Sequence, residues 1–324
     1  MAIVAGIDEA GLGPVLGPLV VSATAFSLPD AKADASMWQL LAGAVCRKSG
    51  KRSTRIAIAD SKELYSGLRG QVGLGRLERG VLTMLATRGL LPPSLEGLLE
   101  IICPPAISQA AAYPWYGSVQ LPLPQVSSLV EMVLSANALD SAMRQAQVKW
   151  LTVRSETVFE HEFNHLAQTS GKGVMLLDVT CRLLMHLWQM PEAQKDRLII
   201  HVDRQGGRMR YLEPLSRVFE GCAFKIMEEN ETLSSYRLTA PGRYAEIYFV
   251  TDCENRQLPV ALASMTSKYL RELFMRIYNS YWTHQVPGLA PTAGYYADGQ
   301  RFYQDILPVV RKMGIDQQTL YRFR

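Results

Sequence analysis

Two adjacent carboxylates near the start of the chain have the residue types that could bind a metal ion. Asp8 and Glu9 follow the apolar run 1–7, which predicts a strand, and precede the glycine-rich run 10–14, which cannot continue one. Successive side chains of a strand point to opposite faces, so the two acids share one pocket only if the strand ends, bulges or turns between them. Residues 18–26 predict a returning strand, so we expect a hairpin with the acids and bare glycine backbone at its tip. Such a tip suits a metal-bound phosphodiester, although the dipeptide alone is more typical of an ordinary turn with two solvated acids.

Further acids follow strand-like runs later in the chain. Asp203 ends the buried-type run that begins at Arg197, and a glycine turn follows it. This is where α/β sheets place chemistry, although the residue could instead cap the next helix. Asp252 follows the strand-like run 244–250 in the same way and is another candidate acid, with Glu254 as the fallback. Four carboxylates from separated segments form an oxygen site that prefers Mg²⁺ or Mn²⁺ to zinc.

The composition indicates a soluble globular protein. The 324 residues, 48% hydrophobic and 20% charged, can bury a substantial core as one large α/β domain or as two domains. A net charge of +4 is compatible with a nucleic-acid partner, and the basic stretch 47–52 is either a solvated loop or a phosphate contact. Five scattered cysteines without a Cys-x-x-Cys pair indicate neither a disulfide framework nor a zinc site. With no signal-peptide pattern and no long apolar run, we expect a cytoplasmic protein that does not enter membranes.

The opening motif resembles a known enzyme family. Gly-Ile-Asp-Glu-Ala-Gly-Leu-Gly-Pro at residues 6–14 resembles the Gly-Ile-Asp-Glu-Ala-Gly-Arg-Gly-Pro pattern of ribonuclease HII, the type 2 ribonuclease H family. Four later segments resemble that family in the same order along the chain. They are Asp60-Ser61-Lys62-Glu63-Leu64, the run ending at Asp203, the stretch from Asp252 to Arg271, and Gly294-Tyr295.

The resemblance implies a fold and an activity. The fold would be the α/β ribonuclease H-like one, a mixed central β-sheet flanked by helices, here with an inserted segment and C-terminal helices. The activity would be a divalent-metal-dependent endonuclease that hydrolyses the RNA strand of RNA/DNA hybrids, or ribonucleotides embedded in duplex DNA, by a two-metal mechanism. No obligate protein partner is expected.

The resemblance also implies roles for individual residues. Mg²⁺ or Mn²⁺ would be bound by the catalytic acids Asp8, Glu9, Asp203 and Asp252. Substrate would be contacted by the glycine-rich loop, two lysines, a serine and a tyrosine. These residues are Gly11, Leu12, Gly13, Lys62, Ser264, Lys268 and Tyr295.

The chain departs from the family pattern in two places. Leu12 stands where the family has arginine, so a bidentate phosphate contact is lost and metal-dependent nuclease is a firmer expectation than cleavage at a single ribonucleotide. The proline-rich stretch 92–147 has no counterpart in the motif pattern. It is either an insertion that packs on the core, or a lid or substrate-binding subdomain in which Trp115 and Tyr116 offer stacking surfaces. The expected parts of the chain are therefore residues 1–91 (N-terminal part of the catalytic domain), 92–147 (insertion), 148–290 (remainder of that domain) and 291–324 (C-terminal helical segment).

Two functions from other classes remain open. His161-Glu162-Phe163-Asn164-His165 matches the His-Glu-x-x-His pattern of zinc peptidases, which places two imidazoles one helical turn apart. A peptidase would need a third ligand downstream, for which Glu192 is an unremarkable candidate. A non-catalytic nucleic-acid-binding relative that kept the fold is the other alternative.

Overall fold

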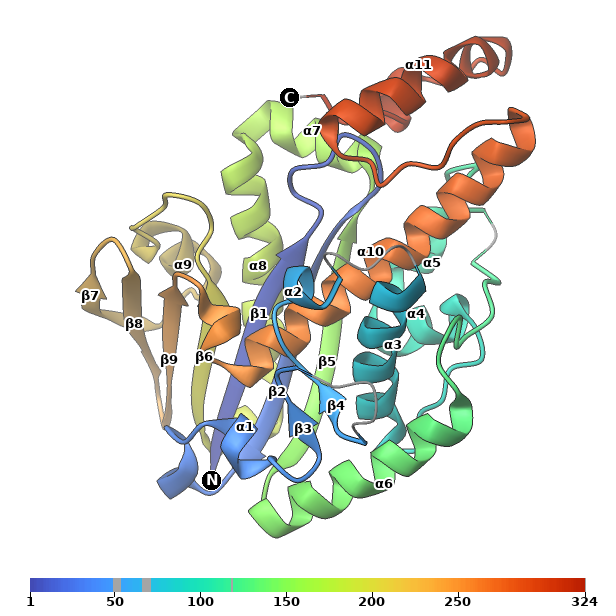
Figure 1. Ribbon diagram of the computed structural model, residues 1–324. Coiled ribbons are helices and arrows are strands. Elements are labelled where there is room, and N and C mark those ends of the chain that lie inside the picture. Colours follow the sequence, from blue (N-terminus) through green and yellow to red (C-terminus); the bar gives the residue numbers. More distant parts are fainter. Residues whose placement is uncertain (49–53, 66–70, 118, 324) are drawn as a thin grey trace.

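The computed structural model describes residues 1–48, 54–65, 71–117 and 119–323 (Figure 1). Its centre is a seven-stranded mixed sheet in the order β5-β2-β1-β6-β9-β8-β7. The strands are β1 (Ala2–Ala10), β2 (Leu19–Leu28), β5 (Lys149–Val158), β6 (Arg197–Asp203), β7 (Ala223–Glu229), β8 (Leu233–Ala240) and β9 (Arg243–Val250), beside a separate parallel pair, β3 (Val45–Cys46) and β4 (Ile56–Ala57). Strands β1, β6 and β9 are parallel to one another, and the other pairings in the large sheet are antiparallel. The expected mixed α/β architecture is confirmed.

Helices flank this sheet. They are α1 (Met37–Leu40), α2 (Ser61–Tyr65), α3 (Gln71–Ala86), α4 (Leu95–Ile102), α5 (Pro105–Ala110), α6 (Leu129–Ala146), α7 (Glu160–Ser170), α8 (Lys172–Gln189), α9 (Leu212–Val218), α10 (Leu258–Gln285) and α11 (Tyr296–Lys312). Short 3₁₀ turns are η1 (Asp30–Lys32), η2 (Glu192–Gln194), η3 (Cys253–Asn255) and η4 (Gln317–Thr319). Among the described residues, no helix is long and apolar enough to cross a bilayer.

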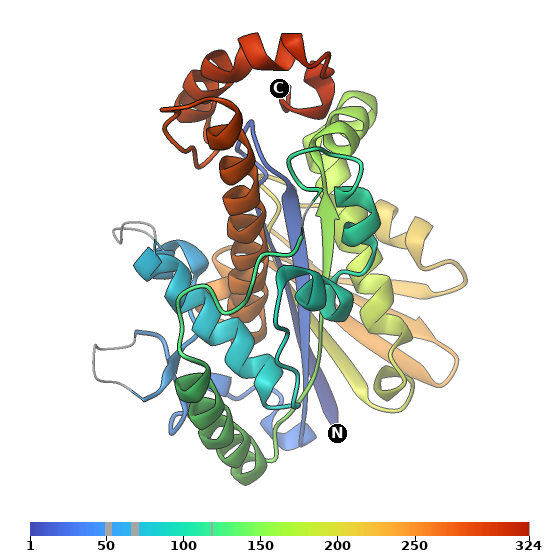
Figure 2. The same ribbon diagram turned by 90° about the vertical axis from the view of Figure 1, so that its right-hand side faces the viewer.

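The sheet separates two layers of helices, with α10 on one side and α8 on the other (Figure 2). Each side has its own hydrophobic cluster. Side chains of a strand alternate between faces, so Val4 of β1 joins the layer under α10 while Ile3 and Ile7 join the layer under α8. Helix α10 lies directly on β1 and β2, and α8 covers β1, β2 and β5 from the other side. The central strands are therefore buried on both faces, which explains their continuous apolar sequences.

Gly6 allows α10 to approach β1 closely. A Cβ atom at this position would lie 2.2 Å from the backbone nitrogen of Val260 and 2.3 Å from the carbonyl carbon of Pro259. The hydroxyl of Thr24 on β2 also donates a hydrogen bond of 2.8 Å to the carbonyl oxygen of Pro259. The start of α10 is thus fixed against the strand that carries the first two acids.

The stretch 92–147 packs on the core. It contains α4, α5 and α6, and its aromatic residues Trp115 and Tyr116 are 1% and 0% exposed. Their rings contact Trp282 and Tyr278 of α10. The alternative of a lid with exposed stacking rings is wrong, because both rings are buried against aromatic side chains of α10.

Strand β1 continues through both acids, contrary to the expected break. Residues Asp8 and Glu9 remain paired with β2, opposite Ser22 and Val21. On its other edge, β1 pairs with β6 only as far as Ile7. Beyond that point this edge of β1 is open, so both acids reach the same hollow although the strand does not turn.

Candidate active site

The carboxyl ends of β1, β6 and β9 surround a hollow of about 400 Å³. Asp8 and Glu9 enter it from β1, and Asp203 is the last residue of β6. Glu254 enters from η3, the turn that follows β9. We call this hollow the carboxylate pocket. Parallel strands place their carboxyl ends at one edge of a sheet, which explains why acids far apart in sequence meet here.

Asp252 lies outside the carboxylate pocket, and Glu254 takes the position expected for it. Asp252 is exposed, has left-handed backbone angles (φ 57°, ψ 40°) and accepts a hydrogen bond of 2.9 Å from the side chain of Asn255. Glu254 is 7% exposed and lines the pocket. The left-handed turn at Asp252 reverses the chain after β9, so the acid two residues later faces inward.

The four pocket carboxylates raise one another's pKa values. Burial, followed by the charge of Asp203, raises the pKa of both Glu9 and Glu254 to about 7. Burial and then Asp8 raise the pKa of Asp203 to about 6, and burial with Glu9 raises the pKa of Asp8 well above its ordinary range. Burial and the mutual repulsion of the acids therefore both favour the protonated form of these carboxyl groups.

The donor set fits a hard divalent cation. All four side chains offer carboxylate oxygens, the ligands that Mg²⁺ and Mn²⁺ prefer. As the side chains lie, Glu9 hydrogen-bonds with Asp8, and Glu254 with Asp203. Within the described ranges, no three His, Cys, Asp or Glu residues are grouped closely enough to hold an ion.

Two lysines line the carboxylate pocket together with the acids. Burial alone would lower the pKa of Lys62, but Asp60 and then Asp8 raise it. The ammonium of Lys268 lies 2.7 Å from a carboxylate oxygen of Glu272 and 4.6 Å from the ring centre of Tyr65. Both lysines line the pocket, as the resemblance implied.

Ser264 connects α10 to the first acid. Its hydroxyl lies 3.0 Å from that of Ser61 and also hydrogen-bonds to the carboxylate of Asp8. Arg271, on the same helix, is 1% exposed and instead donates to the carbonyl oxygens of Leu16 (3.2 Å) and Ala293 (3.0 Å). Side chains of one helix therefore have two different roles: Ser264 contacts the acids, and Arg271 binds the backbone of the neighbouring loops.

The glycine-rich loop and Tyr295 close the remaining side of the carboxylate pocket. Gly11, Leu12 and Gly13 line it, and a Cβ atom at Gly13 would meet no atom within 4 Å. Tyr295 is 54% exposed at the rim, with its ring centre 6.0 Å from the Lys268 ammonium. All the expected substrate-contacting residues lie around one hollow.

Sequence reasoning missed three polar side chains of the pocket. They are Ser61, Tyr65 and Glu272. Tyr65 follows the Asp-Ser-Lys-Glu-Leu segment directly, and Glu272 stands one helical turn after Lys268, so helical spacing could have indicated both. The hydroxyl of Tyr65 donates to Glu272 over 2.7 Å.

The His-Glu-x-x-His pattern forms no metal site in the structure. His161 and His165 are exposed on α7, and Glu162 lies 4.0 Å from a guanidinium nitrogen of Arg182. None of them lines the carboxylate pocket. The peptidase alternative therefore has no support in the geometry. Of the basic stretch 47–52, residues 49–52 lie outside the described residues, and Arg47 donates to the carbonyl oxygen of Asn255.

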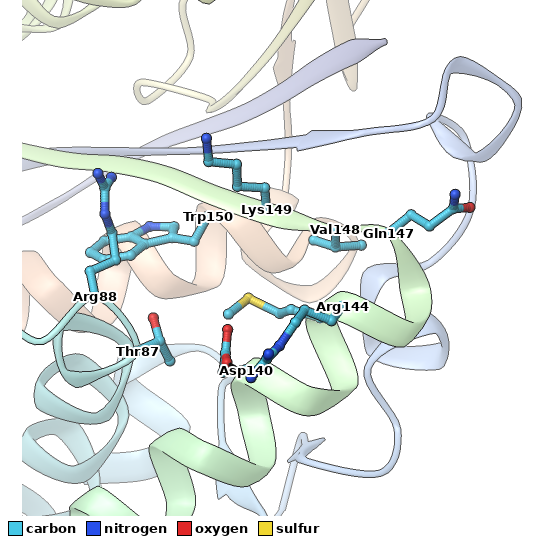
Figure 3. A pocket seen from close by; sticks show the side chains of 9 residues that line it. Thr87, Arg88, Asp140, Arg144, Gln147, Val148, Lys149 and Trp150 are labelled. Carbon is cyan, nitrogen blue, oxygen red and sulfur yellow. Dashed lines mark hydrogen bonds and ion pairs between the residues drawn. The ribbon is translucent and has the colours of Figure 1, made fainter.

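A second hollow lies near the start of β5, at the opposite end of the strands, and is shown in Figure 3. Its basic side chains include Arg144, which pairs with Asp140 one helical turn away, and Arg88, which donates to the carbonyl oxygen of Leu151. Among the described residues that line it, Asp140 is the only acid. It therefore lacks the clustered acids that distinguish the carboxylate pocket.

Fold and site together define a mixed α/β protein with a carboxylate pocket at the ends of its parallel strands. No family model and no curated protein matches the sequence. Among solved structures, the chain is similar to ribonuclease HII from Archaeoglobus fulgidus in its complex with PCNA (14% identity, TM-score 0.41, covering 99% of this chain and 94% of that one). It is also similar to ribonuclease H2 from Pyrococcus horikoshii OT3 (12%, 0.39, 98% and 92%) and to Bst-RNase HIII in complex with Mn²⁺ (14%, 0.36, 99% and 66%). Because these identities and TM-scores are low, the functional assignment rests on the residues of the pocket.

Proposed function

We propose that the protein is a divalent-metal-dependent endonuclease that hydrolyses the RNA strand of RNA/DNA hybrids, or ribonucleotides embedded in duplex DNA. The observation that carries this proposal is the meeting of Asp8, Glu9, Asp203 and Glu254 in one hollow, beside two lysines and a bare glycine backbone. The motif resemblance to ribonuclease HII supports the choice of substrate. The low-identity structural likenesses add no further argument.

The pocket residues divide into two chemical roles. Asp8, Glu9, Asp203 and Glu254 would hold Mg²⁺ or Mn²⁺, which when bound activates a water molecule and stabilises the leaving oxygen of a phosphodiester. Lys62 and Lys268, the latter paired with Glu272, would supply positive charge beside the acids for contact with phosphate. Ser264 orients the Asp8 carboxylate through its hydrogen bond. No nucleophilic side chain is required.

Recognition of ribose would fall to the glycine-rich loop and Tyr295. The 2′-hydroxyl distinguishes RNA from DNA, and backbone N–H groups can bond to it without a side chain. Leu12 lines the pocket but offers no guanidinium, so we expect weaker selection of the flanking phosphate than an arginine would provide.

The test is cleavage of three labelled duplexes with Mg²⁺ or Mn²⁺: an RNA/DNA hybrid, DNA with one embedded ribonucleotide, and plain DNA. We expect cutting only in strands that contain ribonucleotides, and loss of at least about 100-fold in activity for Asp8→Asn, because the amide removes a ligand charge. Cutting of plain DNA, or an Asp8→Asn variant as active as the wild type, would overturn the proposal. Binding of the duplexes without any cleavage would favour the non-catalytic alternative.

A further inference from the structure

A fully buried arginine near the C-terminal end holds the glycine-rich loop. The guanidinium of Arg322 donates to three carbonyl oxygens between β1 and β2, those of Gly11 (2.6 Å), Leu12 (2.8 Å) and Gly17 (3.0 Å). Its backbone N–H donates to the carbonyl oxygen of Val15 over 2.8 Å. Figure 1 shows the C-terminal end of the chain beside the loop that leaves β1. The pocket chemistry described above does not use this arginine.

The segment that carries Arg322 is fastened to α7. The side-chain amide of Asn164 holds three backbone groups of the segment at 2.8–3.0 Å, those of Gln318, Tyr321 and Phe323. The ring centre of Phe163 lies 3.5 Å from the guanidinium carbon of Arg322. The two central residues of the His-Glu-x-x-His pattern thus dock the C-terminal segment.

The environment of Arg322 suits a guanidinium. Burial, followed by the charge of Arg271, lowers its pKa to about 9, so it remains charged at neutral pH. A buried charge is unfavourable unless polar or aromatic groups surround it, and here three carbonyl oxygens, the Phe163 ring and the nearby Glu160 do so. The planar fork of arginine reaches several acceptors at once, which the single ammonium of a lysine does not reproduce.

The contacts of Arg322 determine which way two peptide groups point. In a trans peptide the N–H lies opposite the preceding C=O, so the N–H groups of Leu12 and Gly13 point away from Arg322. Neither N–H has a hydrogen-bond partner within the part of the chain that the structure describes. Both residues line the carboxylate pocket. The loop therefore has two backbone donors on the side away from Arg322, and no described residue of the chain accepts from them.

We propose that Arg322 is a positioning residue that turns the N–H groups of Leu12 and Gly13 into the carboxylate pocket, where they donate to oxygen atoms of the nucleic-acid backbone. This inference rests on the proposed function for the nature of the substrate. The orientation of the loop by Arg322 is independent of it. The C-terminal segment thereby supplies an arginine that binds the loop backbone and does not itself contact substrate.

The experiment compares the full-length wild type with Arg322→Met and Arg322→Lys. Arg311→Met, which removes an exposed arginine of α11, is the matched control. Two quantities are measured: kcat and KM for DNA with one embedded ribonucleotide, and hydrogen–deuterium exchange of the peptide covering residues 11–17. Kinetics of the Arg322 variants are repeated with millimolar guanidinium chloride, against sodium chloride at the same ionic strength.

We expect Arg322→Met to raise KM about ten-fold with kcat changed by less than about three-fold, because the loop amides bind ground and transition states alike. Exchange of residues 11–17 rises in this variant, guanidinium lowers its KM again, and Arg322→Lys recovers part of the affinity. The control matches the wild type in every measurement.

Unchanged KM and unchanged loop exchange in Arg322→Met would overturn the inference, as would a loss that guanidinium does not relieve and that tracks a lower melting temperature. If Arg322→Met does not fold, Arg322→Lys decides by the same two measurements. If the wild type cleaves no duplex, the proposed function fails, and hydrogen–deuterium exchange alone then tests the role of Arg322. Faster exchange of residues 11–17 in the Arg322 variants only would support its role in positioning the loop. Equal exchange in all variants would overturn that role.

Discussion

Asp252 and Glu254 are two residues apart, yet only one faces the other acids. The left-handed backbone at Asp252 turns its side chain to solvent, while Glu254 is buried beside Asp203. A strand-end rule selects Asp252, because it follows β9 more closely. The local turn reverses that choice, and sequence spacing carries no direct sign of it.

The choice between these two acids can be tested with isosteric amides. Glu254→Gln should lower metal-dependent cleavage at least about 100-fold, because it removes one of four ligand charges, whereas Asp252→Asn should stay within about three-fold of the wild type. Steady-state kinetics with Mn²⁺ on an RNA/DNA hybrid measure both. The opposite ranking would show that the turn after β9 rearranges when metal binds.

At the scale of elements, the junction of β1 with α10 connects the sheet to the site. Helix α10 carries Ser264 and Lys268 to the pocket, and its first turn lies against Gly6, only two residues before Asp8. This close backbone contact at Gly6 therefore sets the distance between Asp8 on the strand and the side chains of Ser264 and Lys268 on the helix.

Replacing Gly6 by alanine should disrupt this junction. The added methyl group would lie 2.2 Å from the backbone nitrogen of Val260, and a helix backbone cannot move aside as a side-chain tip can. We expect a loss of at least about 3 kcal/mol in the free energy of unfolding. Thermal and denaturant melts measure it. Gly43→Ala, whose Cβ would meet no atom within 4 Å, is the matched control and should change stability little. Equal melting of both variants would show that α10 can shift without cost.

At the scale of the whole molecule, buried polar groups connect the ends of the chain to its middle. Glu160, at the start of α7, accepts hydrogen bonds from the hydroxyl of Tyr116 (2.8 Å) and the backbone N–H of Gly17 (3.2 Å), and Arg322 lies nearby. The loop after β1, the stretch 92–147, α7 and the C-terminal segment therefore meet at one place. Residues of all four expected parts of the chain also share one hydrophobic cluster.

This meeting point should make stability depend on pH. Burial raises the pKa of Glu160 to about 7 from an ordinary value of 4.5, so the folded state holds the proton more tightly than the unfolded chain. Its contribution is fully present below pH 4.5 and is lost as the pH rises to about 7, by roughly 3 kcal/mol. Glu160→Gln cannot ionise, so its melting temperature relative to the wild type should rise between pH 5 and pH 8. Melting curves at several pH values measure this difference. A constant difference would show that Glu160 titrates normally.

The sequence by itself determined the central strands and most of the residues that line the carboxylate pocket. Short continuous apolar runs predicted β1, β2, β6 and β9, because a strand that is buried on both faces needs apolar residues at successive positions. Asp8, Glu9 and Asp203 were recognisable because each stands at or near the end of such a run. Their assembly in one pocket follows from parallel pairing, which the sequence indicates only through the motif resemblance.

The tertiary structure alone decided the features that depend on contacts between distant segments. The partial pairing of β1 with β6 lets Asp8 and Glu9 share a hollow without a break in the strand. The burial of Trp115 and the role of Arg322 arise from packing partners more than 100 positions away in sequence. Local propensity and residue spacing describe only neighbours along the chain. The hydrogen bond from Arg322 to the carbonyl oxygen of Gly11 joins residues 311 positions apart, so no local sequence pattern predicts it.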